Sequence, residues 1–110
     1  MTTFDERERS FEKKFALDQE LKFRAEARRN KLLGEWAAAK LGLAGADVEA
    51  YVKAVRKTDL VAKSKEDVFH KVMQDLEAKG VAVTATELRQ AMTQFLAQAV
   101  AQIEAESTRR

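Results

Sequence analysis

The first 41 residues contain no proline and only one glycine, Gly34, so nothing in this stretch is expected to end a helix. Proline and cysteine are absent from the whole chain of 110 residues. The remaining composition is rich in alanine, lysine, glutamate, leucine and glutamine, which favour helices. We therefore predict an all-α fold with a single domain.

Local start and stop signals divide the rest of the chain into helices. Thr84 and Glu87 form a capping box, in which each residue can satisfy a backbone N–H of the other. Gly80 is a natural stop for the preceding helix, and Asp47 is a candidate N-cap shortly after Gly45. Because the connections are short, neighbouring helices are expected to be antiparallel. We predict an antiparallel four-helix domain at residues 17–106, with helices at about 17–41, 47–61, 65–79 and 85–106, and a disordered tail at 107–110.

The last predicted helix carries one apolar stripe at helical spacing, which we assign to the core. Its members are Leu88, Met92, Phe95, Leu96, Ala99 and Ile103. The helix would be about 33 Å long, and a helix over residues 17–41 would be about as long. A helix that started near residue 4 would overhang this bundle. We therefore expect residues 1–16 to form a protruding, mobile segment, either disordered or helical in the free protein.

Three phenylalanines in this segment lie seven and four positions apart, at Phe4, Phe11 and Phe15. On a helix they would form a narrow apolar stripe, rotated from the stripe of the following helix. The first interpretation is that the stripe waits for the groove of a partner protein. The second is that the segment bends back and covers the protein's own core.

Composition and charge argue against several classes of protein. Twenty basic and 18 acidic residues give a net charge of +2 with interspersed signs, which is too balanced for a nucleic-acid-binding protein. No apolar run approaches the length of a membrane span, and the charged N-terminus is unlike a secretion signal. One histidine and no cysteine provide no metal site, and no catalytic motif is present. We therefore expect neither an enzyme nor a cofactor, and we place the protein in the cytoplasm.

A second feature is a basic run in the middle of the first predicted helix. It contains Arg28, Arg29 and Lys31, with Trp36 one to two turns further along. The simplest interpretation is a solvated face. The functional interpretation is a secondary contact with an acidic partner surface, or a nucleotide site that combines phosphate contacts with stacking on the indole.

At these two segments the sequence resembles the ATPase inhibitor subunit zeta family of alpha-proteobacterial F-type ATP synthases. The matching stretches are TTFDERERSFEKKFALD at residues 2–18 and EARRNKLLGEWAA at residues 26–38. Weaker similarity continues through DVEAYVKAV and EDVFHKV to the end of the domain. The resemblance implies a four-helix protein whose mobile N-terminus inhibits ATP hydrolysis by the catalytic head of the synthase.

The inhibitory positions that the resemblance carries over are Phe4, Arg7, Glu8, Phe11, Lys14 and Phe15. It implies that this segment enters a catalytic subunit interface and blocks rotation. The implied partners are the alpha and beta subunits of the head, with gamma as a further candidate. The protein would then be peripheral at the cytoplasmic face of the inner membrane, held there through the synthase, and monomeric when free.

Two other functions remain open from the residues alone. The first is a small helical nucleotide-binding regulator that uses the groove near Arg28, Lys31 and Trp36. The second is a helical adaptor, or a coiled-coil homodimer that buries the phenylalanine stripe against a second copy.

Overall fold

The computed structural model describes residues 19–62, 64 and 66–108, and all regular structure within these ranges is helical. The helices are α2 (Gln19–Lys40), α3 (Ala46–Val61), α4 (Glu66–Ala78) and α5 (Ala85–Thr108). The predicted all-α class with four helices is therefore confirmed. The predicted segment 1–16 lies outside the described residues. At the other end, α5 reaches Thr108, so the helix includes the first two positions of the predicted tail.

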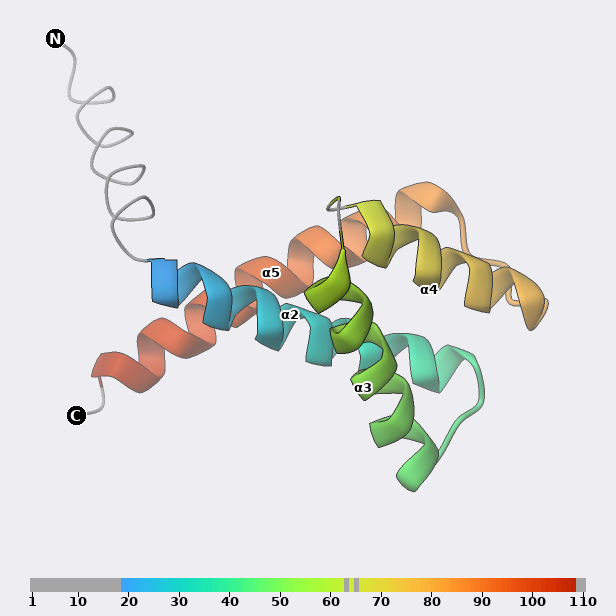
Figure 1. Cartoon of the computed structure of the whole chain (residues 1–110), viewed down its shortest axis with the longest axis horizontal. Coiled ribbons are helices and arrows are strands. Elements are labelled where there is room, and N and C mark those ends of the chain that lie inside the picture. The colour runs from blue at the N-terminus through green and yellow to red at the C-terminus, as the bar shows by residue number, and fades with distance from the viewer. Residues whose placement is uncertain (1–18, 63, 65, 109–110) are drawn as a thin grey trace, which may run out of the picture.

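The longest helices, α2 and α5, lie side by side and run in opposite directions (Figure 1). Helix α3 crosses α2 obliquely, and α4 lies beside the first half of α5 (Figure 1). Helix α2 contacts all three other helices and is the central element of the bundle. The beginning of α2 and the end of α5 lie at the same end of the molecule (Figure 1).

The core lies where the four helices meet and is mostly aliphatic, with Phe69 as its buried aromatic residue. Its largest fully buried side chains are Leu33, Leu76, Leu88, Ile103, Val55, Val68 and Val72, together with the polar Asn30. Of the stripe predicted on α5, Leu88, Ala99 and Ile103 are buried. The assignment of Leu96 to the core is wrong, because this side chain is 36% exposed at the edge of the stripe.

At two helix ends, the capping interactions predicted from the sequence are present in the structure. The Thr84 hydroxyl accepts a hydrogen bond from the backbone N–H of Glu87 at 3.1 Å, as the capping box predicts. Gly80 has a φ of 75° and ends α4, and the Val81 N–H donates to the Leu76 carbonyl at 2.9 Å. This is the bond of a Schellman motif, which requires a left-handed residue at the position of Gly80.

One predicted cap is wrong. Helix α3 begins at Ala46, and its N-cap is Gly45 with a φ of 59° and no side-chain cap bond. Asp47 instead lies in the first turn. Its carboxylate still interacts favourably there with the N-terminal end of the helix dipole.

Polar bridges attach α4 to both neighbours. The Tyr51 hydroxyl of α3 donates to Asp75 of α4 at 2.8 Å, and burial together with this bond raises the pKa of the phenol above its ordinary value. On the other side, Arg89 of α5 donates to Glu66 at 2.9 Å and lowers the pKa of that carboxyl. The second bridge is exposed and therefore contributes little to stability.

Helices α2 and α3 approach most closely at Gly34. A Cβ atom added at this residue would lie 3.0 Å from Cγ2 and 3.1 Å from Cα of Val52. The second of these atoms belongs to the backbone and cannot rotate away. The absence of a side chain at Gly34 therefore sets the separation of the two helices.

We predict that Gly34→Ala lowers the free energy of unfolding by about 1 kcal/mol or more. Overpacking at a helix contact costs about 1–3 kcal/mol, and the upper part of this range applies here because a backbone atom of Val52 cannot move aside. After subtraction of the gain of about 1 kcal/mol in helix propensity from replacing glycine with alanine, a net loss of about 1–2 kcal/mol is left. The measurement is urea denaturation followed by circular dichroism. Glu35→Ala, at the exposed neighbouring position, is the control and should change stability by no more than about 0.5 kcal/mol. Equal stabilities of the two variants would contradict the close contact.

Candidate functional site

Two groups of residues were predicted from the sequence to contact a partner. The first group, Phe4, Arg7, Glu8, Phe11, Lys14 and Phe15, lies outside the described residues. This group precedes Gln19, the first described residue of α2, in the sequence. The second group, Arg28, Arg29, Lys31 and Trp36, lies on α2, where the structure separates its members into three different environments.

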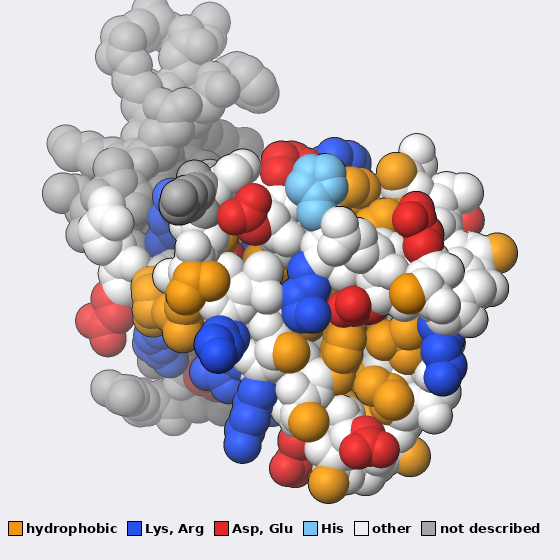
Figure 2. Space-filling model, turned by 45° about the vertical axis from the view of Figure 1, so that its right-hand side comes forward, with side chains coloured by type: hydrophobic (Ala, Val, Ile, Leu, Met, Phe, Trp, Pro, Cys, Tyr) orange, Lys and Arg blue, Asp and Glu red, His pale blue; other side chains and the backbone are white. Residues whose placement is uncertain are grey.

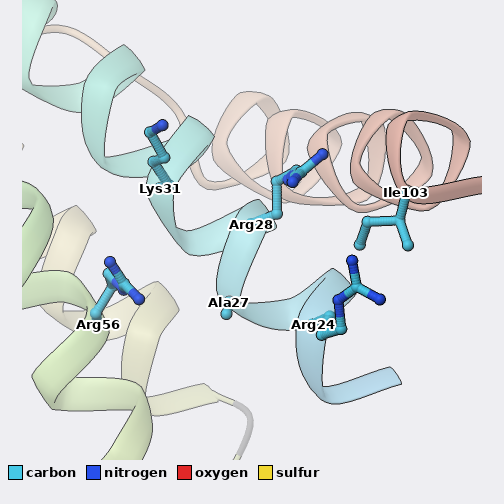
Figure 3. A pocket seen from close by; sticks show the side chains of 6 residues that line it. All are labelled: Arg24, Ala27, Arg28, Lys31, Arg56 and Ile103. Atoms are coloured by element: carbon cyan, nitrogen blue, oxygen red, sulfur yellow. The ribbon is translucent and has the colours of Figure 1, made fainter. Parts of the chain in front are cut away.

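Arg28 and Lys31 line a cleft of about 270 Å³ between α2, α3 and α5. We call it the basic cleft. Its walls are formed by Arg24, Ala27, Arg28, Lys31, Arg56 and Ile103. Figure 3 shows that Arg24, Arg28 and Lys31 follow one side of α2, whereas Arg56 faces them from α3 and Ile103 comes from α5. Four cationic side chains therefore surround one hollow.

Spacing explains why three of these cations share a side of α2. Positions 24, 28 and 31 are separated by four and three residues, which places them one above the other on a helix. Sequence reasoning could have added Arg24 by this rule. It could not have added Arg56, because that residue reaches the cleft only through the crossing of α2 and α3.

One of the four cations is already paired within the protein. The Arg28 guanidinium makes a two-fold contact with the Glu106 carboxylate of α5, at 2.6 and 3.2 Å. This hydrogen bonding raises the pKa of Arg28 above its ordinary value. Arg24, Lys31 and Arg56 form no ion pair with any residue that the structure describes. The cleft therefore keeps an excess of positive charge suited to a multivalent anion.

Arg29 points away from the cleft and into a buried network between α2 and α3. Its Nε and Nη2 atoms donate to Oδ1 of Asn30 at 3.1 and 2.9 Å. Asn30, only 1% exposed, donates in turn to Oδ2 of Asp59 at 2.8 Å. The side chain of Asn30 is thus satisfied on both its oxygen and its nitrogen, as burial of an amide requires.

The buried role of Asn30 was missed from the sequence, although a signal was present. Asn30 precedes Leu33, Gly34 and Ala37 at helical intervals, so it shares the apolar face of α2. An amide on that face requires a partner on the facing helix. The identity of the partner, Asp59, could not be read from the sequence.

Trp36 packs between α2 and α5. Its ring makes an edge-to-face contact with Phe95, with 6.4 Å between ring centroids, and the Lys40 ammonium lies 4.9 Å from its centroid. Trp36 is absent from the lining of the basic cleft. The indole and the cations of the cleft therefore belong to different parts of the α2 surface.

Two further kinds of feature are absent from the described part of the chain. No group of three or more histidine, aspartate or glutamate side chains there could hold a metal ion. None of the helices α2 to α5 has the length and apolarity that crossing a membrane requires.

Comparison with known proteins gives a match over most of the chain. The family model described as ATPase inhibitor subunit zeta matches residues 1–102. A protein with a solved solution NMR structure is 41% identical, with a TM-score of 0.68, and the match covers 78% of this chain and 98% of that one. No match was found among curated proteins.

We predict that Asn30→Ala lowers the free energy of unfolding by about 1–3 kcal/mol, because it leaves the Asp59 carboxylate without its buried donor. Lys31→Ala, at the adjacent exposed position, is the control and should have an effect of no more than about 0.5 kcal/mol. Chemical denaturation of both variants measures the difference. If both variants unfold at the same denaturant concentration, the network does not join α2 to α3.

Proposed function

The chain belongs to the ATPase inhibitor subunit zeta family, whose members are regulatory rather than catalytic proteins, and from this premise we propose that it inhibits ATP hydrolysis by the catalytic head of an F-type ATP synthase. The observation that carries the proposal is the extent of the family match. It begins at residue 1 and therefore includes the segment with Phe4, Phe11 and Phe15 as well as the bundle.

In the proposed mechanism the segment before α2 binds at a catalytic interface between two subunits. Phe4, Phe11 and Phe15 enter an apolar groove as one face of a helix, and Arg7, Glu8 and Lys14 make polar contacts at its rim. Such an interface opens and closes during each catalytic cycle. A helix that binds one state more tightly than the others holds the enzyme in that state, by the difference in affinity.

The folded bundle has a separate role in this mechanism. Ordering about 15 residues on binding opposes the gain from apolar burial, as in other coupled folding and binding reactions. A bundle that begins at Gln19 stays directly beside the docked segment and can add contacts of its own. Its bulk also keeps the segment from being drawn through the interface.

The proposed partners are the alpha and beta subunits of the head, and the gamma subunit is a third candidate. The protein would be cytoplasmic and peripheral to the inner membrane through the synthase. We further propose that it is monomeric when free.

The basic cleft supports a second candidate function, the binding of a free nucleotide. Three cations that form no ion pair within the described residues, Arg24, Lys31 and Arg56, line a cleft of about 270 Å³. They could hold a di- or triphosphate by charge and hydrogen bonding. Because Trp36 lies outside the lining, this site would recognise the phosphates and not a stacked base.

Deletion of residues 1–15 should abolish inhibition of the ATPase from the same organism. The bundle should keep its thermal unfolding midpoint within a few degrees, because the buried side chains of the described core all lie after the deletion, from Ala25 onward. Hydrolysis rates at increasing inhibitor concentration are the measurement. A truncated protein that still inhibits would refute the assignment of the segment.

Phe11→Ala should weaken inhibition at least fivefold, because truncating a buried aromatic anchor commonly costs more than 1 kcal/mol. Lys13→Ala is the matched control, since residue 13 lies opposite the phenylalanine stripe on a helix and is expected to face solvent. The inhibition constants of both variants provide the comparison. Equal constants would remove Phe11 from the set of anchors.

For the second candidate, titration calorimetry with ATP should give a binding isotherm that is weakened at least tenfold in Arg56→Ala and unchanged in Lys57→Ala. Arg56 lines the cleft, whereas the exposed Lys57 is absent from its lining. If millimolar ATP gives no heat with the unmodified protein, the cleft is not a nucleotide site.

A further inference from the structure

Large hydrophobic side chains remain exposed at one place on the bundle. Phe23 on α2 is 64% exposed, and Leu60 and Val61 in the last turn of α3 are 73% and 71% exposed. Phe23 and Leu60 line the same small groove. We call these three residues the apolar patch. The remaining large hydrophobic residue exposed in the described chain, Leu96, is only 36% exposed and lies on α5.

The apolar patch continues directly into the basic cleft. Arg56 and Ala27 line both hollows, and Arg24 follows Phe23 on α2. The groove also contains two carboxylates, those of Glu26 and Asp59, and the carboxylate of Asp59 already accepts from Asn30. The positive charge of this surface therefore comes from its basic cleft side, at Arg24 and Arg56. Figure 2 shows one face of the molecule, on which hydrophobic side chains reach the surface between basic ones. A complementary surface would be apolar opposite Phe23 and Leu60 and acidic opposite the arginines.

The position of the patch in the chain indicates what covers it. Phe23 lies eight positions after Phe15, the last predicted anchor of the N-terminal segment. Residues 19–23 belong to α2 and span about 6 Å, and the four positions from 15 to 19 add at most about 14 Å even when fully extended. A surface that binds residues 1–15 is therefore within reach of the patch, whatever conformation the intervening residues adopt.

We propose that the apolar patch is a second anchor for the ATPase head, continuous with the groove that receives residues 1–15. The inference rests on the proposed function and adds a bundle contact to it. The patch binds an apolar spot of the head surface beside that groove, and Arg24 and Arg56 lie opposite carboxylates at the edge of the spot. The two anchors lie on one chain, so that docking of the segment raises the local concentration of the patch at its own site.

The test is the inhibition constant of the full-length double variant Phe23→Ser, Leu60→Ser. We expect the constant to rise about tenfold or more, with complete inhibition still reached at saturation because residues 1–15 are retained. Leu96→Ser is the matched control and should change the constant less than twofold. Because both replaced side chains are exposed, the thermal unfolding midpoint should stay within a few degrees, and Leu60→Lys alone provides a second variant of the same patch.

Three results would overturn the proposal. An unchanged constant would mean that the head does not contact the patch. A lower constant would mean that the patch holds residues 1–15 in the free protein and that its loss releases them. A wild-type dimer in sedimentation that becomes a monomer in the double variant would mean that a second copy covers the patch.

The proposed carboxylates of the head surface, opposite Arg24 and Arg56, can be tested separately through the salt dependence of inhibition. Arg56→Glu should raise the inhibition constant most strongly at low ionic strength, where charge attraction is least screened. An effect independent of salt would overturn the predicted acidic rim.

Failure of the patch is distinguishable from failure of the proposed function. If deletion of residues 1–15 abolishes inhibition while the double variant inhibits normally, only the second anchor is refuted. If the deletion variant still inhibits, the function itself is refuted.

Discussion

The close approach of α2 and α3 at Gly34 is the constraint on which the rest of the structure depends. With Val52 directly against the α2 backbone, the two helices cross at a fixed distance and angle. The buried bond from Asn30 to Asp59 then fixes their register one turn away. This crossing brings Arg56 opposite the cations of α2 and places Leu60 beside Phe23. The packing contact at Gly34 has no functional role itself, but it determines the geometry of both the basic cleft and the apolar patch.

The described fold and the proposed inhibitory function belong to two different parts of the chain. The described bundle has a satisfied polar core and no metal cluster, and its polar bonds hold helices together. The residues proposed to inhibit precede Gln19, whereas the buried side chains of the described core begin at Ala25. Such a division suits an inhibitor, because the residues proposed to bind and the residues that form the described core are different ones. The bundle in turn provides a stable body on which secondary contacts can be arranged.

The sequence predicted the features that depend on neighbouring residues. Composition and the absence of proline predicted the all-α class, and Gly80 and the capping box at Thr84 predicted where helices end and begin; the structure confirms both. Features that depend on contacts between helices either could not be predicted from the sequence or were predicted wrongly. Leu96 has the right spacing for the core, but it lies at the edge of the packed face. Arg28 and Arg29 are adjacent in sequence, yet one lines the cleft and the other turns inward, because successive helical positions face different neighbours. The inhibitory positions themselves remain a prediction.

Trp36 is the only tryptophan in the chain, and it is held between the aromatic edge of Phe95 and the ammonium of Lys40. Its fluorescence therefore originates from the α2–α5 contact alone. Emission should shift sharply when these helices separate during unfolding, because the indole then becomes hydrated. Trp36 is thus an intrinsic fluorescent probe of the folded bundle. Its signal can be recorded separately from that of a label placed on the segment that precedes α2.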